Sequence, residues 1–87
     1  MPNPYTKKVS ADRLIEDHTK LVKKYAYFYA GRVQKAAEVE DLLQVGMIGL
    51  IEAAHNYVQK EGVNFESYAR LRIKGSIVDY LRKASNL

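Results

Sequence analysis

The central segment of the chain, residues 42–51, is apolar on almost every side of the helix that it would form, and this restricts the fold most strongly. Its sequence, LLQVGMIGLI, contains no charged residue and does not alternate between apolar and polar residues as a strand would. A helix that is apolar nearly all round must be buried nearly all round. In a chain of 87 residues, either two neighbouring helices cover this one, or one side stays exposed for a partner protein. The sequence leaves both alternatives open.

The rest of the chain also follows the helical period, which predicts an all-α fold, a compact bundle of three principal helices. The expected helices cover residues 10–35, 40–57 and 65–83. Ser10 and Asn64 are the expected N-caps of the first and third helices. We expect residues 1–9 to be disordered, residues 84–87 to form a frayed tail, and residues 36–39 to form a short extra turn.

Apolar residues at steps of three and four predict which helix faces form the core. On the first helix these are Leu14, His18, Leu21, Val22, Tyr25, Ala26, Tyr29 and Val33. On the third helix they are Phe65, Ala69, Ile73, Ser76, Ile77 and Tyr80. Tyr5 and Tyr27 are also expected to serve packing rather than function. Gly46 and Gly49 would weaken the second helix by about 1 kcal/mol each, so we expect a close helix approach there to offset that loss.

The opposite face of the third helix mixes cationic, aromatic and aliphatic side chains. Its members are Tyr68, Leu71, Arg72, Gly75, Val78, Asp79 and Arg82, with Arg70 and Lys74 at its flanks. Arginine and lysine neutralise phosphates, and a tyrosine ring offers a stacking surface for an unpaired base. The other interpretation is an ordinary solvated face, on which Asp79 and Arg82 form an ion pair three residues apart.

The composition limits the possible functions. The chain has a net charge of +4, which fits a nucleic acid or an anionic surface as partner. It contains no cysteine, and His18 and His55 lie far apart, so no metal site or other cofactor is predicted. No apolar run reaches the roughly 20 residues of a membrane span, and the N-terminus lacks the apolar core of a signal peptide. A cytoplasmic protein is therefore expected.

Motifs in the second half of the chain resemble those of the sigma-70 family of bacterial RNA polymerase sigma factors. Residues 40–53, EDLLQVGMIGLIEA, are similar to the family's DLxQxGxIGLxxA signature. Residues 65–69, FESYA, follow at the family's spacing and resemble its FxTYA element. Residues 72–82, RIKGSIVDYLR, are similar to the form found in flagellar (motility) sigma factors. The resemblance covers residues 12–83 and implies region 2, the helical domain that binds the polymerase core and melts promoters.

The resemblance implies two binding surfaces and no catalytic residue. The first signature would dock on the clamp-helix coiled coil of the largest polymerase subunit through Asp41, Gln44, Val45, Met47 and Ile51. The second element would hold the non-template strand of the promoter −10 element, with a flipped adenine between Tyr68 and Tyr57. The full set of implied DNA-binding residues is Tyr57, Phe65, Tyr68, Arg70, Arg72, Lys74, Val78 and Arg82. An anti-sigma factor is a further implied partner.

The chain departs from the family pattern at three places. Leu71 and Arg72 stand where primary sigma factors carry a Trp pair, and Val63 replaces an aromatic residue found just before the second element. Regions 3 and 4, which follow in the family, are absent from the 87 residues. The missing Trp pair implies an alternative sigma factor with a narrow choice of promoters. Without regions 3 and 4, the chain is expected to be either a fragment of a longer protein or a stand-alone region 2.

Three other functions are weighed against this one. A sigma-like protein-interaction module, an anti-sigma target or a decoy, would bind the polymerase without useful DNA contact. A membrane-bound helical domain would need lysine and arginine on one side and exposed apolar residues on the other, but the apolar stripe of the first helix is better explained as core. An enzyme is disfavoured, because no nucleophile–base pair or pair of acids stands at a useful spacing.

Overall fold

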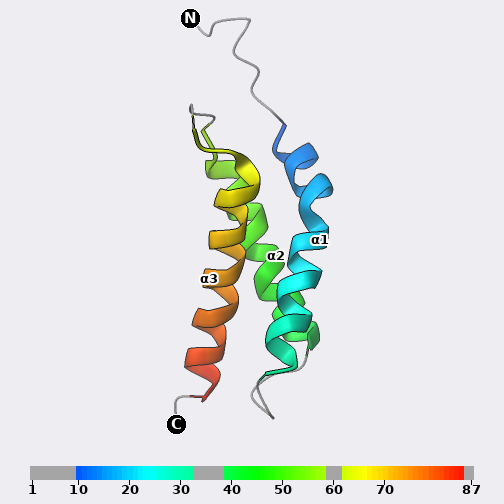
Figure 1. The fold of residues 1–87 in the computed structure, drawn as a ribbon, viewed down its shortest axis with the longest axis vertical. Coiled ribbons are helices and arrows are strands. Elements are labelled where there is room, and N and C mark those ends of the chain that lie inside the picture. The colour runs from blue at the N-terminus through cyan, green and yellow to red at the C-terminus, as the bar shows by residue number, and fades with distance from the viewer. Residues whose placement is uncertain (1–9, 33–38, 59–61, 86–87) are drawn as a thin grey trace, which may run out of the picture.

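Three helices follow one another in the described part of the computed structural model. They are α1 (Ala11–Ala30), α2 (Val39–Asn56) and α3 (Phe65–Ser85), and the structure describes residues 10–32, 39–58 and 62–85. α2 packs against both of its neighbours, whereas α1 and α3 contact each other less (Figure 1). The predicted all-α bundle of three helices is confirmed.

The helix ends differ from the predicted ones by one or more residues, except for the start of α3 at Phe65, which was predicted correctly. α1 ends at Ala30, because the backbone turns at Gly31 and Arg32, so the predicted end at Lys35 is wrong. The Arg32 N–H donates to the Tyr29 carbonyl oxygen at 3.0 Å, a three-residue step that tightens the last turn. α2 begins at Val39, and α3 continues to Ser85, beyond the predicted end at Lys83. The disorder expected for residues 1–9 and most of the turn expected at 36–39 lie outside the described residues.

The two predicted N-caps behave differently. The Asn64 side-chain oxygen accepts a hydrogen bond from the Ser67 backbone N–H at 2.8 Å, so it satisfies one of the free donors at the start of α3. Ser10 occupies the N-cap position of α1, but its side chain makes no capping hydrogen bond. Only its carbonyl oxygen takes part, accepting the Leu14 N–H at 3.0 Å.

The core is formed by apolar residues from all three helices. The buried members are Leu14, Val22, Ala26, Leu42, Leu50, Ala53, Ala54, Phe65, Ala69, Ile73, Ile77 and Leu81. The predicted apolar stripe of α1 is buried or half-buried at each described position, and Val33 lies outside the described residues. Tyr5 also lies outside them, and the packing role expected for Tyr27 is wrong, since its residue surface is 61% exposed.

The buried residues of α3 follow a row of strict four-residue steps. Phe65, Ala69, Ile73, Ile77 and Leu81 are all buried, whereas the predicted core residues Ser76 and Tyr80 are only half-buried. Four-residue rows are inclined to the helix axis, so the buried face rotates along α3 as the helix crosses its neighbours. The predicted core face, which runs parallel to the helix axis, therefore does not include Leu81.

The two glycines of α2 lie where the helices come closest, as predicted. A Cβ atom on Gly49 would lie 2.6 Å from the Ser76 Oγ atom and 2.8 Å from the Arg72 carbonyl oxygen. A Cβ atom on Gly46 would lie 3.1 Å from a methyl group of Val22. α3 thus approaches the backbone of α2 directly at Gly49, and this contact fixes how the exposed faces of the two helices are placed.

Candidate functional surfaces

The outer face of α2, formed by Gln44, Ile48 and Ile51, points away from the core. Ile48 is 54% exposed and Ile51 is 38% exposed, although both lie in the most apolar segment of the chain. One side of this helix therefore stays exposed, and its use by a partner protein remains a prediction. Glu40 and His55 continue the same exposed side toward the two ends of the helix.

The predicted docking residues lie on and beside this outer face. Gln44 and Ile51 are exposed, and Asp41, Val45 and Met47 are half-buried at its edges. Ile48 is missing from the predicted set, although it lies one helical turn after Gln44 and is more exposed than Ile51. The polar Gln44 four residues before Ile48 was the available sequence signal, since residues four apart lie on adjoining parts of one helix face.

An aromatic cluster of His18, Tyr57, Phe65 and Tyr68 joins the three helices at one end of the bundle. The Phe65 ring meets His18 edge-on with centroids 4.8 Å apart, and meets Tyr57 in the same way at 5.2 Å. The Tyr57 and Tyr68 rings are 6.0 Å apart and inclined by 31°. The predicted pocket residues Tyr57, just after α2, and Tyr68, on α3, thus lie close together.

The members of the aromatic cluster differ in how much surface they offer to a ligand. Phe65 is 6% exposed, so it supports the neighbouring rings from the core side. Tyr57 and Tyr68 are half-buried and keep part of their surface in solvent. The Tyr57 hydroxyl donates to the Val63 carbonyl oxygen at 2.8 Å, which ties the ring to the residues that precede α3.

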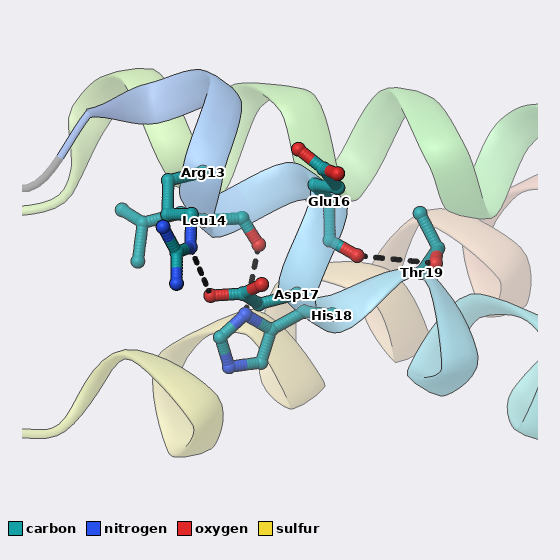
Figure 2. Close-up of polar contacts among 6 residues, drawn as sticks. All are labelled: Arg13, Leu14, Glu16, Asp17, His18 and Thr19. Atoms are coloured by element: carbon teal, nitrogen blue, oxygen red, sulfur yellow. Dashed lines mark hydrogen bonds and ion pairs between the residues drawn. The ribbon is translucent and has the colours of Figure 1, made fainter.

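His18 is held in this cluster by its own helix. Figure 2 shows its ring beside the Leu14 carbonyl oxygen, which is 2.8 Å from Nδ1. A carbonyl oxygen only accepts, so Nδ1 carries the proton and donates. His18 is therefore a packing residue, and its position beside Phe65 was not predicted from the sequence.

Two further polar contacts lie within the same helix. Arg13 pairs with Asp17 at 3.1 Å, and the Thr19 hydroxyl donates to the Glu16 carbonyl oxygen at 3.4 Å (Figure 2).

The predicted cationic residues of α3 lie on more than one side of the helix. Arg72 lies one turn after Tyr68, whereas Arg70 and Lys74 lie one turn from each other on a different side, because residues two apart on a helix do not face each other. Two of these cations are engaged by carboxylates: Arg72 by Glu52 of α2 at 3.0 Å, and Arg70 by Glu66 at 2.8 Å. The partner of Arg72 was not predicted, because twenty residues separate the two side chains in the sequence.

The C-terminal half of α3 carries the remaining predicted positions. Val78 is half-buried and Arg82 is exposed. Asp79 pairs with Lys83 at 3.1 Å, one residue beyond the partner that the solvated-face interpretation expected. Gly75 faces open space, since no atom lies within 4 Å of the position that a Cβ would take.

Other kinds of site find no support within residues 10–32, 39–58 and 62–85. In this part of the chain, no three His, Asp or Glu side chains are grouped so that they could hold a metal ion. None of the helices there combines the length and apolarity that crossing a membrane requires.

Comparison with known sequences agrees with this arrangement. Residues 14–86 match the family Sigma-70 region 2. Over 74 residues the chain is 47% identical to the RNA polymerase sigma factor FliA of Pseudomonas aeruginosa, covering 85% of this chain and 30% of that protein. It is 38% identical over 69 residues to FliA of Escherichia coli K12, covering 79% of this chain and 29% of FliA. The chain thus spans about a third of the length of these relatives.

Comparison with solved structures gives the same result. The sigma factor in the cocrystal structure of the flagellar sigma/anti-sigma complex, Sigma-28/FlgM, superposes with a TM-score of 0.77 at 37% identity. The match covers 95% of this chain and 37% of the other. The family match covers most of the helical bundle, and it includes both the outer face of α2 and the aromatic cluster. The chain belongs to the sigma-70 family, as a region 2 domain of the flagellar type.

Proposed function

We propose that this chain is the part of a sigma factor that binds the RNA polymerase core and holds the opened −10 element of flagellar-type promoters during transcription initiation. The observation that carries the proposal is the outer face of α2, where Ile48 and Ile51 are exposed in a member of this family. Aliphatic side chains beside Gln44 and Asp41 suit a partner surface with a dry centre and a polar rim. The partner would be the clamp-helix coiled coil of the largest polymerase subunit.

The aromatic cluster and the cations of α3 support the DNA-binding part of the proposal. Tyr57 and Tyr68 offer adjoining ring surfaces, and base stacking on such rings contributes about 1–3 kcal/mol per base. Arg72 lies one turn from Tyr68, within reach of the backbone of a strand whose base stacks there. The domain itself would be non-catalytic and would act in the cytoplasm with the polymerase, which performs the chemistry.

The docking part is tested by capturing the purified clamp-helix coiled coil with this chain and with an Asp41→Ala, Gln44→Ala double variant. We expect the parent to bind and the double variant to lose binding, because the orienting polar contacts of the outer face are removed. A Glu16→Ala, Lys20→Ala double variant is the matched control, since both of these residues are exposed on α1 and should be neutral. Failure of a folded parent to bind would contradict the docking proposal.

The DNA-binding part is tested with a short single strand that carries the −10 element. Tyr68→Ala should weaken binding about tenfold or more through lost stacking, and Arg72→Ala should also flatten the salt dependence. Tyr57→Phe is the control, because it keeps the ring and removes only the hydrogen bond to Val63. If Tyr68→Ala and Arg72→Ala both bind like the parent, the chain is instead a sigma-like protein-interaction module.

An anti-sigma factor is proposed as a second partner. The structural relative is described in a flagellar sigma/anti-sigma complex, and this chain covers 37% of that sigma factor. Binding of an anti-sigma factor to this chain alone, measured by calorimetry, would place at least part of that contact within region 2.

A further inference from the structure

The contact between Glu52 and Arg72 joins the helix that carries the outer face to the helix proposed to bind DNA. The Arg72 Nη2 atom lies 3.0 Å from the Glu52 Oε1 atom. The ion pairs Arg13–Asp17, Arg70–Glu66 and Lys83–Asp79 differ from it, because each lies within a single helix at a spacing of four residues. An interhelix pair of this kind depends on how the two helices are packed.

The packing at Gly49 explains why Arg72 meets Glu52. The Arg72 carbonyl oxygen would be 2.8 Å from a Cβ on Gly49, so the backbone of α3 at Arg72 is held directly against α2. Glu52 lies three residues after Gly49 and therefore on an adjoining part of the same side of α2. The Arg72 side chain consequently runs beside Glu52, rather than projecting from α3 into open solvent.

This contact reduces the positive charge that α3 offers to a phosphate. The Glu52 carboxylate occupies one donor of the guanidinium and places a negative charge beside it. The two side chains are 39% (Arg72) and 53% (Glu52) exposed, so water and ions screen the pair and a phosphate can compete for Arg72. An exposed ion pair is weak enough for a phosphate to displace Glu52 from Arg72. Breaking the pair nevertheless costs free energy, which reduces the net free energy of strand binding.

We propose that Glu52 attenuates the affinity of α3 for a single DNA strand by competing with the strand's phosphates for Arg72. The inference rests on the proposed DNA-binding function and names Glu52, on α2, as a residue that sets its strength. Arg72 is the contact residue, and Glu52 acts through it. Removing the carboxylate charge should therefore strengthen strand binding, whereas loss of an ordinary stabilising contact would leave it unchanged or weaken it.

The test measures binding of a fluorescent single strand of about 12 nucleotides by anisotropy, over a range of salt concentrations. The proteins are the parent, Glu52→Gln, Arg72→Ala and the double variant. We expect Glu52→Gln to bind about three to five times more tightly at low salt, the size of effect that an exposed ion pair supplies. The slope of log K against log salt should steepen by about 0.7, because one more phosphate is neutralised.

The double variant separates a competition for Arg72 from a general charge effect. In the Arg72→Ala background, Glu52→Gln should give no gain. Glu66→Gln is the matched control: Glu66 is 54% exposed against 53% for Glu52, and it pairs with Arg70 instead. Any gain from Glu66→Gln should persist when Arg72 is replaced. An equal gain from Glu52→Gln in both backgrounds, or no gain in the parent background, would overturn the proposal.

The same measurements distinguish failure of this inference from failure of the proposed function. Binding of the strand by the parent, without a gain in Glu52→Gln, rejects the role of Glu52 and leaves DNA binding intact. No binding by either protein rejects both. The midpoint of thermal unfolding, measured for each variant, shows that the compared proteins are folded at the temperature of the titration.

Discussion

At the scale of single residues, two glycines within helices have opposite surroundings. Gly49 is buried, with the Ser76 Oγ atom and the Arg72 carbonyl oxygen inside the space that a side chain would need. Gly75 is exposed, and no atom lies within 4 Å of its would-be Cβ. Packing therefore explains the glycine at position 49 and does not explain the one at position 75.

Replacing these glycines by alanine should change stability in opposite directions. Gly49→Ala should lower the free energy of unfolding by about 1–3 kcal/mol, because a backbone carbonyl cannot move aside as a flexible side chain can. Gly75→Ala should raise it by about 1 kcal/mol, because alanine favours an exposed helix interior. Urea unfolding followed by circular dichroism measures both, and a Gly49→Ala variant as stable as the parent would contradict the close contact.

Some residue contacts could be predicted from the sequence and others could not. The resemblance to the sigma-70 family implied that Tyr57 and Tyr68 lie close together, and their ring centroids are 6.0 Å apart. The pairing of Glu52 with Arg72 was not predictable, since it depends on the rotation of α3 against α2. Ile48 matches the Ile of the family signature but was not among the predicted docking residues, and its exposure became evident only in the structure.

At the scale of helices, α1 and α3, whose N-cap residues are described, differ in how they are capped. The Asn64 side chain accepts the Ser67 N–H, whereas the Ser10 side chain makes no capping hydrogen bond. Asn64→Ala should therefore destabilise the fold by about 1 kcal/mol, and Ser10→Ala should change it by no more than a few tenths. Thermal unfolding of the two variants measures the difference, and equal losses would show that the capping contact at Asn64 is unimportant.

The helix faces were predicted better than the helix ends. The apolar period placed the cores of α1 and α3, since burial of one side determines that pattern. It missed Leu81, because the buried row of α3 follows four-residue steps that drift around the helix as it crosses α2. The end of α1 was predicted too late, because the apolar period continues past Ala30 to Val33, whereas the helix already ends before Gly31.

At the scale of the whole molecule, the buried side of α2 stabilises the fold, whereas its exposed side is the one proposed to bind a partner. Leu50 is fully buried, whereas Ile48, two residues earlier, is 54% exposed. Ile48→Ser should leave the free energy of unfolding within about 0.5 kcal/mol of the parent while weakening capture of the clamp-helix coiled coil about tenfold. Leu50→Ala, the matched core change, should destabilise by about 2–5 kcal/mol. Unchanged capture by Ile48→Ser would show that the partner does not cover Ile48.

The contact at Gly49 has a mechanical consequence for a chain with two proposed binding surfaces. The backbone of α3 lies directly against Gly49 of α2, and packed protein interiors compress little. If both proposed surfaces are used, a shift or tilt of α2 on its partner would be passed to α3 almost unchanged, so the position of the partner would determine the position of the Tyr57 and Tyr68 rings. A larger side chain at residue 49 would push α2 and α3 apart. It would thereby misalign the two surfaces without changing the side chains that form them.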